Sequence, residues 1–173
     1  MKKILLSLAL LTVTYISFAQ SSSSTLVSIG PEIGQPLGQA NRVYNLVYGG
    51  SIKIEIPVSR SGLNVTLTAG YDVFKTYSYL SGYIENGQYI PVEIGLKNYI
   101  EHSVVFIEGD LGASFDNNDN YTGAKAAFIF APAIGVSVAK NTLDISARYE
   151  GRVETGGTIS QLALRVAVKF GGK

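Results

Sequence analysis

The chain contains a single histidine, His102, which is the first residue to consider for catalysis. Together with Ser103 and an acid such as Glu101 or Asp110, an imidazole can activate a hydroxyl nucleophile in a lipid hydrolase or acyltransferase. Successive residues of a β-strand point to opposite faces, so His102 and Ser103 in one strand would point apart. We therefore interpret His102 as a rim histidine and predict a protein that is not an enzyme, with no catalytic residue and no cofactor.

A second candidate is the segment 116–120, whose Asp and Asn side chains offer the oxygen ligands that Ca²⁺ prefers. An EF-hand loop needs a glycine at its sixth position and an acid at its twelfth, where this chain has Tyr121 and Ala127. Asp and Asn are also favoured in tight turns, so we interpret the segment as a hairpin turn. Thiolate metal sites are excluded because the chain has no cysteine. We predict no metal.

The largest set of chemical groups is a series of charged side chains spaced by even numbers of residues within otherwise apolar runs. In each run the charges occupy one parity, and parity in a strand means one face. Glu32, Lys125 and Asp144 belong to this series. The other twelve members form the network that we predict inside a barrel lumen: Lys53, Glu55, Asp72, Glu93, Lys97, Glu108, Asp110, Arg148, Glu150, Arg152, Arg165 and Lys169.

The runs that carry these charges are predicted strands. Alternation of apolar and polar residues recurs over eight segments with turn residues between them. No amphipathic helix competes with them. The predicted strands are 25–33, 43–57, 63–74, 88–99, 102–115, 122–138, 142–153 and 158–170.

Composition places these strands in one exported domain. Of the 173 residues 46% are hydrophobic and only 16% are charged, against about 25% in typical soluble domains. Residues 1–19 carry two lysines, an apolar stretch and a Ser-Phe-Ala end, the layout of a cleaved secretory signal peptide. Residues 20–24 are predicted to be a flexible leader and 25–173 the barrel domain. A net charge of +1 argues against nucleic-acid binding.

Alternation alone does not decide which face is inside. The polar face combines small residues with eight acids and seven bases, which can neutralise one another when buried. The aromatic residues lie mainly near the ends of the runs, as in the girdles of membrane barrels. We therefore predict an all-β, eight-stranded antiparallel up-and-down transmembrane β-barrel with its apolar face on lipid. The aromatics expected in the girdles are Tyr44, Tyr71, Phe74, Tyr89, Tyr99, Tyr121, Tyr149 and Phe170.

The connections at one end are shorter on average than those at the other, as expected for short periplasmic turns and longer outer loops, although the fourth outer loop, 154–157, is also short. The predicted turns are 58–62, 100–101 and 139–141, and the predicted loops are 34–42, 75–87, 116–121 and 154–157. Loops 34–42 and 75–87 are the best candidate surfaces for partners. Loop 75–87 carries Tyr77, Tyr79 and Tyr83, which either form an interaction surface or extend the girdle.

Three segments resemble the small outer-membrane β-barrel domain family, which is similar to the OmpA transmembrane domain and OmpX. They are Gly30–Gly34, Tyr89–Tyr99 and Leu162–Phe170. The resemblance implies a barrel in the bacterial outer membrane, surrounded by its lipid, and no single activity. Family members usually end near an aromatic residue that resembles the signal read by the barrel-insertion machinery; here Phe170 is followed by Gly171, Gly172 and Lys173.

These observations predict a small, monomeric, non-enzymatic outer-membrane barrel whose lumen is plugged by paired charges and whose role is structural or a surface interaction. Two alternatives remain. One is a soluble periplasmic or secreted barrel that binds an apolar ligand, as lipocalins do. The other is a membrane-embedded lipid-modifying enzyme.

Overall fold

The structure, a computed structural model, describes residues 25–59, 62–100, 104–117, 126–154 and 157–171. The predicted signal peptide and leader lie outside the described residues. Among the residues described, no helix is long and apolar enough to cross a membrane. The elements are β1 (Leu26–Leu37), a 3₁₀ turn η1 (Ala40–Arg42), β2 (Tyr44–Pro57), β3 (Leu63–Thr76), β4 (Gly87–Tyr99), β5 (Val105–Asp116), β6 (Ala126–Val138), β7 (Leu143–Glu154) and β8 (Gly157–Gly171).

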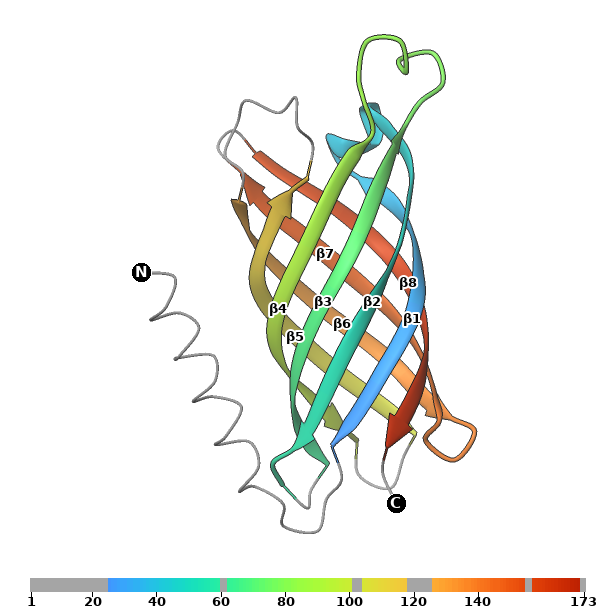
Figure 1. The fold of residues 1–173 in the computed structure, drawn as a ribbon, viewed down its shortest axis with the longest axis vertical. Coiled ribbons are helices and arrows are strands. Elements are labelled where there is room, and N and C mark those ends of the chain that lie inside the picture. The colour runs from blue at the N-terminus through green and yellow to red at the C-terminus, as the bar shows by residue number, and fades with distance from the viewer. Residues whose placement is uncertain (1–24, 60–61, 101–103, 118–125, 155–156, 172–173) are drawn as a thin grey trace, which may run out of the picture.

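The eight strands form a closed antiparallel barrel in chain order, which confirms the predicted fold class. Each strand pairs with its neighbours in sequence, and β8 closes the ring by pairing with β1 from Leu26↔Gly171 to Leu37↔Ser160. Closure leaves no exposed strand edge. The start of β1 and the end of β8 lie together at one end, the terminal end, and the connection between β3 and β4 projects from the other, the long-loop end (Figure 1).

The first strand is longer than the sequence predicts. We expected β1 to end at residue 33 because Gly34 and Pro36 are turn-forming residues, but the strand continues to Leu37. Here β1 pairs with β8, and a Cβ atom on Gly34 would lie 2.9 Å from Cβ of Ala163, so glycine permits the close approach. Strand pairing therefore overrides the local turn preference, and the connection to β2 shrinks from the predicted 34–42 to residues 38–43.

Three prolines interrupt the hydrogen-bonded ladders in the middle of the wall. The registers of β1 with β8, of β3 with β4 and of β6 with β7 each skip the proline, at Pro31, Pro91 and Pro132. Each proline stays in register with its other neighbouring strand. Proline has no backbone N–H to donate, so it is compatible with only one of its two ladders.

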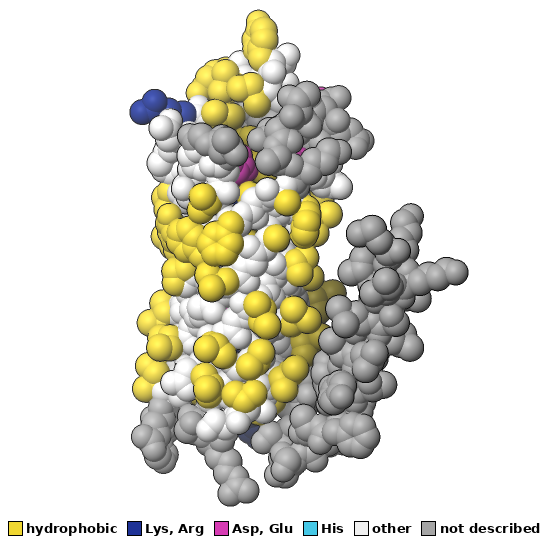
Figure 2. All heavy atoms as spheres, turned by 90° about the vertical axis from the view of Figure 1, so that its left-hand side faces the viewer, with side chains coloured by type: hydrophobic (Ala, Val, Ile, Leu, Met, Phe, Trp, Pro, Cys, Tyr) yellow, Lys and Arg dark blue, Asp and Glu magenta, His cyan; other side chains and the backbone are white. Residues whose placement is uncertain are grey.

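The two faces of the wall differ sharply. Apolar side chains point outward: Ile94 is 61% exposed and Leu164 is 48% exposed. The charged side chains of alternate positions point into the lumen, where Arg152 and Lys97 are each 1% exposed. Figure 2 shows hydrophobic side chains spread over the wall on the face that it draws. Most of the large side chains buried inside this barrel are therefore charged or polar, and their pairing must offset the cost of removing them from water.

Candidate functional site in the barrel lumen

The lumen contains fourteen buried charged side chains in the described part of the chain. All twelve residues of the predicted network lie there, together with Glu32 and Asp144, whereas Lys125 lies outside the described residues. Eight are carboxylates and six are cations. Isolated ions are costly to bury, so their pairing determines whether this interior is stable. The ion pairs fall into three groups along the barrel axis.

The first group lies near the terminal end and joins four strands. Lys97 on β4 donates to Glu55 Oε1 of β2 at 2.7 Å and to Asp144 Oδ2 of β7 at 2.5 Å. Lys169 on β8 lies 2.6 Å from Asp144 Oδ1 and donates to Tyr99 Oη at 3.0 Å. Two carboxylates and two ammonium groups therefore neutralise one another across this end of the lumen.

The β6–β7 turn also closes the terminal end. Lys169 Nζ donates to Ser137 Oγ at 2.6 Å and to Asn141 Oδ1, so the turn is tied to β8. Ala139, Lys140 and Asn141 all have positive φ, between 51° and 67°. This left-handed region is unfavourable for residues with a Cβ atom, though least so for asparagine. Asn141 thus combines a tolerated backbone conformation with a contact to the lumen.

The second group lies near the middle of the barrel. Lys53 on β2 forms an ion pair with Glu108 of β5 and lies 3.7 Å from Asp110, which also accepts a hydrogen bond from Thr66 Oγ1 at 2.9 Å. Arg165 lies outside this group. It donates to Ser51 Oγ at 2.7 Å and to Ser28 Oγ at 3.3 Å, and no carboxylate of the described residues lies within 4.0 Å of it. The guanidinium of Arg165 is thus held by hydroxyl groups.

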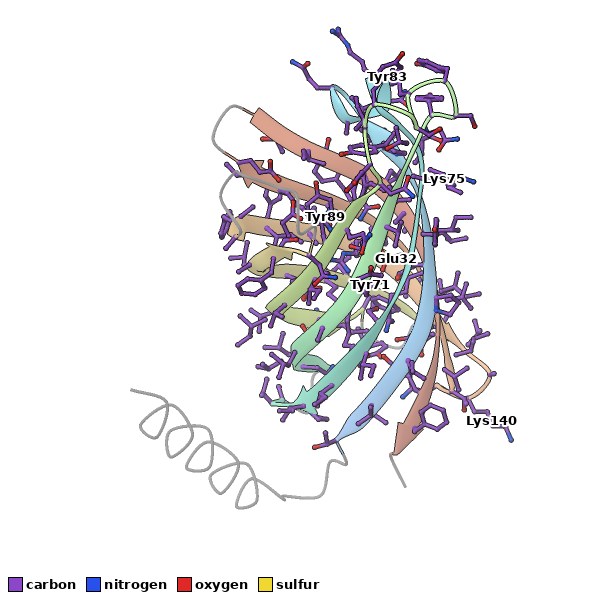
Figure 3. The ribbon with its side chains drawn as sticks, turned by 45° about the horizontal axis from the view of Figure 1, so that its top comes forward. Glu32, Tyr71, Lys75, Tyr83, Tyr89 and Lys140 are labelled. Atoms are coloured by element: carbon purple, nitrogen blue, oxygen red, sulfur yellow. The ribbon has the colours of Figure 1, made fainter. Side chains whose placement is uncertain are left out.

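The third group, towards the long-loop end, is organised by two arginines of β7. Arg148 approaches three carboxylates: Glu32 of β1 at 3.7 Å, Glu150 at 2.7 Å, and Glu93 of β4. Arg152 continues the chain to Glu150 at 2.6 Å and to Asp72 of β3 at 2.8 Å. Figure 3 shows Glu32 within the barrel. Arg148 and Arg152 therefore link β1, β3 and β4 to β7 across the lumen.

Aromatic rings occupy the lumen beyond Arg152. Phe74 is fully buried and packs edge-on against Tyr89 and Tyr44, with ring centroids 5.4 and 5.5 Å apart. The guanidinium carbon of Arg152 lies 4.9 Å from the ring of Phe74 and 4.3 Å from that of Tyr89. A cation over an aromatic face is attracted to its π electrons. The rings and the arginine thus form one plug, with Val47 as its aliphatic member.

This plug corrects the predicted aromatic girdle. Tyr71 and Phe170 are on the outer face as expected, but Phe74 and Tyr89 lie inside, and Tyr99 points to the ions at the terminal end. Tyr44 packs against the plug, Tyr149 is half-buried, and Tyr121 lies outside the described residues. The sequence did indicate that these two rings point inward. Phe74 lies on the same face of its strand as Asp72, and Tyr89 lies on the same face as Glu93. We missed it by considering only their position near strand ends.

The other predicted sites have different outcomes. Glu101, His102 and Ser103 lie outside the described residues, as does most of the segment 116–120. Asp110, proposed as their acid, is a buried lumen residue paired with Lys53. Within the described ranges no group of acidic or histidine side chains is arranged to hold a metal ion.

The β3–β4 connection projects from the long-loop end (Figure 1) and contains hydrogen-bonded turns. Tyr83 is 92% exposed and Tyr79 is 70% exposed, and the ring of Tyr79 stacks on that of Tyr77 at 5.4 Å. Backbone hydrogen bonds fold the loop on itself, from Leu80 N to Tyr77 O at 2.8 Å and from Tyr83 N to Leu80 O at 2.9 Å. The loop therefore presents the rings of Tyr79 and Tyr83 to solvent from hydrogen-bonded turns.

Comparison with known proteins supports the fold. No protein-family model matches the chain, and no curated protein is detectably similar in sequence. Solved structures match over most of the chain. One is Ail, the attachment invasion locus protein of Yersinia pestis, with a TM-score of 0.59, 15% identity, and coverage of 87% of this chain and 100% of Ail. Another structure of Ail describes it as an outer membrane protein in a phospholipid bilayer nanodisc.

A second similar structure is the outer membrane enzyme PagL, with a TM-score of 0.61 and 14% identity, covering 82% of this chain and 98% of PagL. The resemblance to small outer-membrane barrels that the sequence suggests is therefore confirmed for the fold. One of these two matched proteins is an enzyme, so the fold does not decide whether this chain has an activity.

Proposed function

We propose that this chain is an outer-membrane β-barrel protein whose lumen is closed by buried ion pairs and which acts through the surface at its long-loop end, without catalysis. One observation carries the proposal: the wall is apolar outside and ionic inside. In hydrocarbon every backbone group must be paired, and a closed barrel satisfies this requirement. An outward apolar band about 25 Å tall is the surface that such a barrel presents to lipid.

The same observation argues against the soluble alternative. A lipocalin-like barrel that binds an apolar ligand needs an apolar lumen and a polar exterior. Here the lumen contains Arg148 and Glu93, while Ile52 and Leu164 are about half exposed on the outside. Such an exterior would associate in water, since soluble monomers rarely expose large continuous apolar surfaces.

The composition and turns of the β3–β4 loop support a surface-interaction role. Tyrosine, serine, glycine and asparagine dominate residues 77–87, and these residue types recur in the binding loops of antibodies. Tyr79 and Tyr83 supply rigid amphipathic rings, and the hydrogen bonds of the loop reduce the entropy lost on binding. We expect a monomer in outer-membrane lipid, inserted by the barrel-insertion machinery through β8.

The side-chain orientation can be tested by labelling. Cysteines are introduced singly at Leu164 and Ala163, neighbours on β8 that face out and in, and the folded protein is reconstituted in phospholipid vesicles. A lipid-soluble maleimide is expected to label L164C much faster than A163C. Equal labelling, or faster labelling of A163C, would reject the membrane orientation. Heat-modifiable gel mobility provides the check that both variants are folded.

The interaction role needs a separate test. Cells that display the wild-type chain are compared, in adhesion to cultured cell layers, with cells that display the double variant Tyr79→Ser, Tyr83→Ser. Both side chains are mostly exposed, so we expect unchanged stability and lower adhesion. Unchanged adhesion would remove the loop as an interaction surface. The enzymatic alternative predicts deacylated or modified lipid in the mass spectrum of membranes that contain the chain.

A further inference from the structure

The outer wall contains an apolar groove of about 660 Å³ across β1, β2 and β3. Its floor is made by the smallest outward side chains of these strands, Pro31, Gly50 and Ala69. Ile29, Ile52 and Tyr71 also line it.

Strand register explains the hollow. Pro31 pairs with Gly50, so these two small residues of β1 and β2 lie side by side. Gly50 pairs with Tyr71 and Ile52 pairs with Ala69, so Ala69 of β3 lies diagonally next to Gly50. The inward neighbours Gly30 and Gly70 add no side chain to the inner surface of the wall. The groove is therefore built into the paired backbone of three strands and does not depend on one side-chain rotamer.

A cation lies above this groove. Lys75 is exposed on the outer face of β3, four residues beyond Tyr71 towards the long-loop end, and points away from the barrel (Figure 3). Four residues span about 14 Å along a strand, or roughly 10 Å along the axis at a tilt of about 40°. No carboxylate of the described chain forms an ion pair with Lys75.

A hydrogen bond on the outer surface marks where the apolar band ends towards the long-loop end. Tyr71 Oη donates a hydrogen bond to Gln88 Oε1 at 2.6 Å on the outer surface of β3 and β4. Tyrosine hydroxyls at this height are typical of the boundary between hydrocarbon and head groups. The groove therefore lies in the apolar half of one leaflet, and Lys75 lies at head-group depth.

We propose that the groove and Lys75 together bind one lipid of the outer leaflet whose phosphate-bearing head group carries a net negative charge. Its phosphate pairs with Lys75 Nζ, and one of its acyl chains lies along Pro31, Gly50 and Ala69. The proposal rests on the outer-membrane function proposed above. A second copy of the chain fits less well, because a two-fold interface would place one hollow against another and leave both unfilled.

The test uses the full mature chain in phosphatidylcholine vesicles that contain a small amount of chain-labelled nitroxide lipid. Electron spin resonance measures how much labelled phosphatidylglycerol, compared with labelled phosphatidylcholine, is motionally restricted by the protein. We expect the wild type to favour phosphatidylglycerol about fivefold, the factor for one basic side chain near an anionic lipid. Lys75→Gln should abolish this preference, while Lys140→Gln, which removes an exposed lysine at the terminal end, should retain it.

A second pair of variants tests the groove. Ala69→Leu fills it and should reduce the restricted fraction of both labels. Gly109→Leu adds the same side chain to the outer face of β5, where a Cβ atom meets nothing within 4 Å, and should change neither label. Equal effects of the two leucines, or a phosphatidylglycerol preference that survives Lys75→Gln, would overturn the lipid site.

Two further outcomes separate this inference from the function on which it rests. A chain that neither co-sediments with vesicles nor shows heat-modifiable mobility contradicts the outer-membrane proposal itself. A chain that inserts but shows no lipid preference contradicts the lipid site alone. Efficient disulfide cross-linking of Ala69→Cys between two copies in vesicles would assign the groove to self-association and likewise overturn the lipid site.

Discussion

Replacing Arg148 with methionine tests whether the ion pairs of the lumen hold the barrel together. The guanidinium is buried and faces Glu32, Glu93 and Glu150. Glu150 keeps Arg152 as a partner in the variant, but Glu32 and Glu93 have no other ion pair in the described part of the chain. Leaving buried charges without a partner costs about 3–5 kcal/mol, and we expect the free energy of unfolding to fall by that amount.

Arg165→Met is the matched control, because it removes the same group from the same lumen. Arg165 donates only to Ser51 and Ser28, so no carboxylate loses an ion pair when it is removed. Each such hydrogen bond contributes about 0.5–1.5 kcal/mol, and the expected loss is about 1–2 kcal/mol. The contrast between the two variants therefore depends on ion pairing, not on the volume or position of an arginine.

The assay is reversible urea unfolding of the chain in phospholipid vesicles, followed by heat-modifiable gel mobility. The double variant R148M/E93Q should be more stable than R148M, because it removes one of the unpaired carboxylates. The reasoning is refuted if Arg148→Met and Arg165→Met lose the same stability, or if adding Glu93→Gln to Arg148→Met destabilises further.

Two other predictions use the same assay. Phe74→Ala truncates the fully buried ring of the plug and should cost about 3–5 kcal/mol, whereas Phe170→Ala, on the outer face, should cost clearly less; equal losses would contradict a packed plug. Lys140→Gly should stabilise the barrel by about 0.5–1 kcal/mol, because Lys140 has a φ of 57°, where a Cβ atom is unfavourable, and an unchanged or lower midpoint would show that the turn is not strained.

The number of strands and their faces follow from local sequence. A strand alternates because successive side chains point to opposite sides, so Lys53 and Glu55 had to share a face whatever their partners. Glycine and proline were less reliable guides. They predicted the end of β1 at residue 33, yet pairing with β2 continues to Gly34 and pairing with β8 extends the strand to Leu37.

Sequence alone thus determined which side chains share one face of each strand, because alternation is a property of the backbone of each strand. It did not determine which of them meet. Arg148 and Arg165 are the same residue type, lie on the charged face of their strands and are equally buried, yet one meets three carboxylates and the other two serine hydroxyls. Contacts across the lumen depend on the stagger between strands and on the closure of β8 against β1, which bring residues from opposite walls to one height. The distances between side chains of opposite walls are therefore fixed only when the barrel closes.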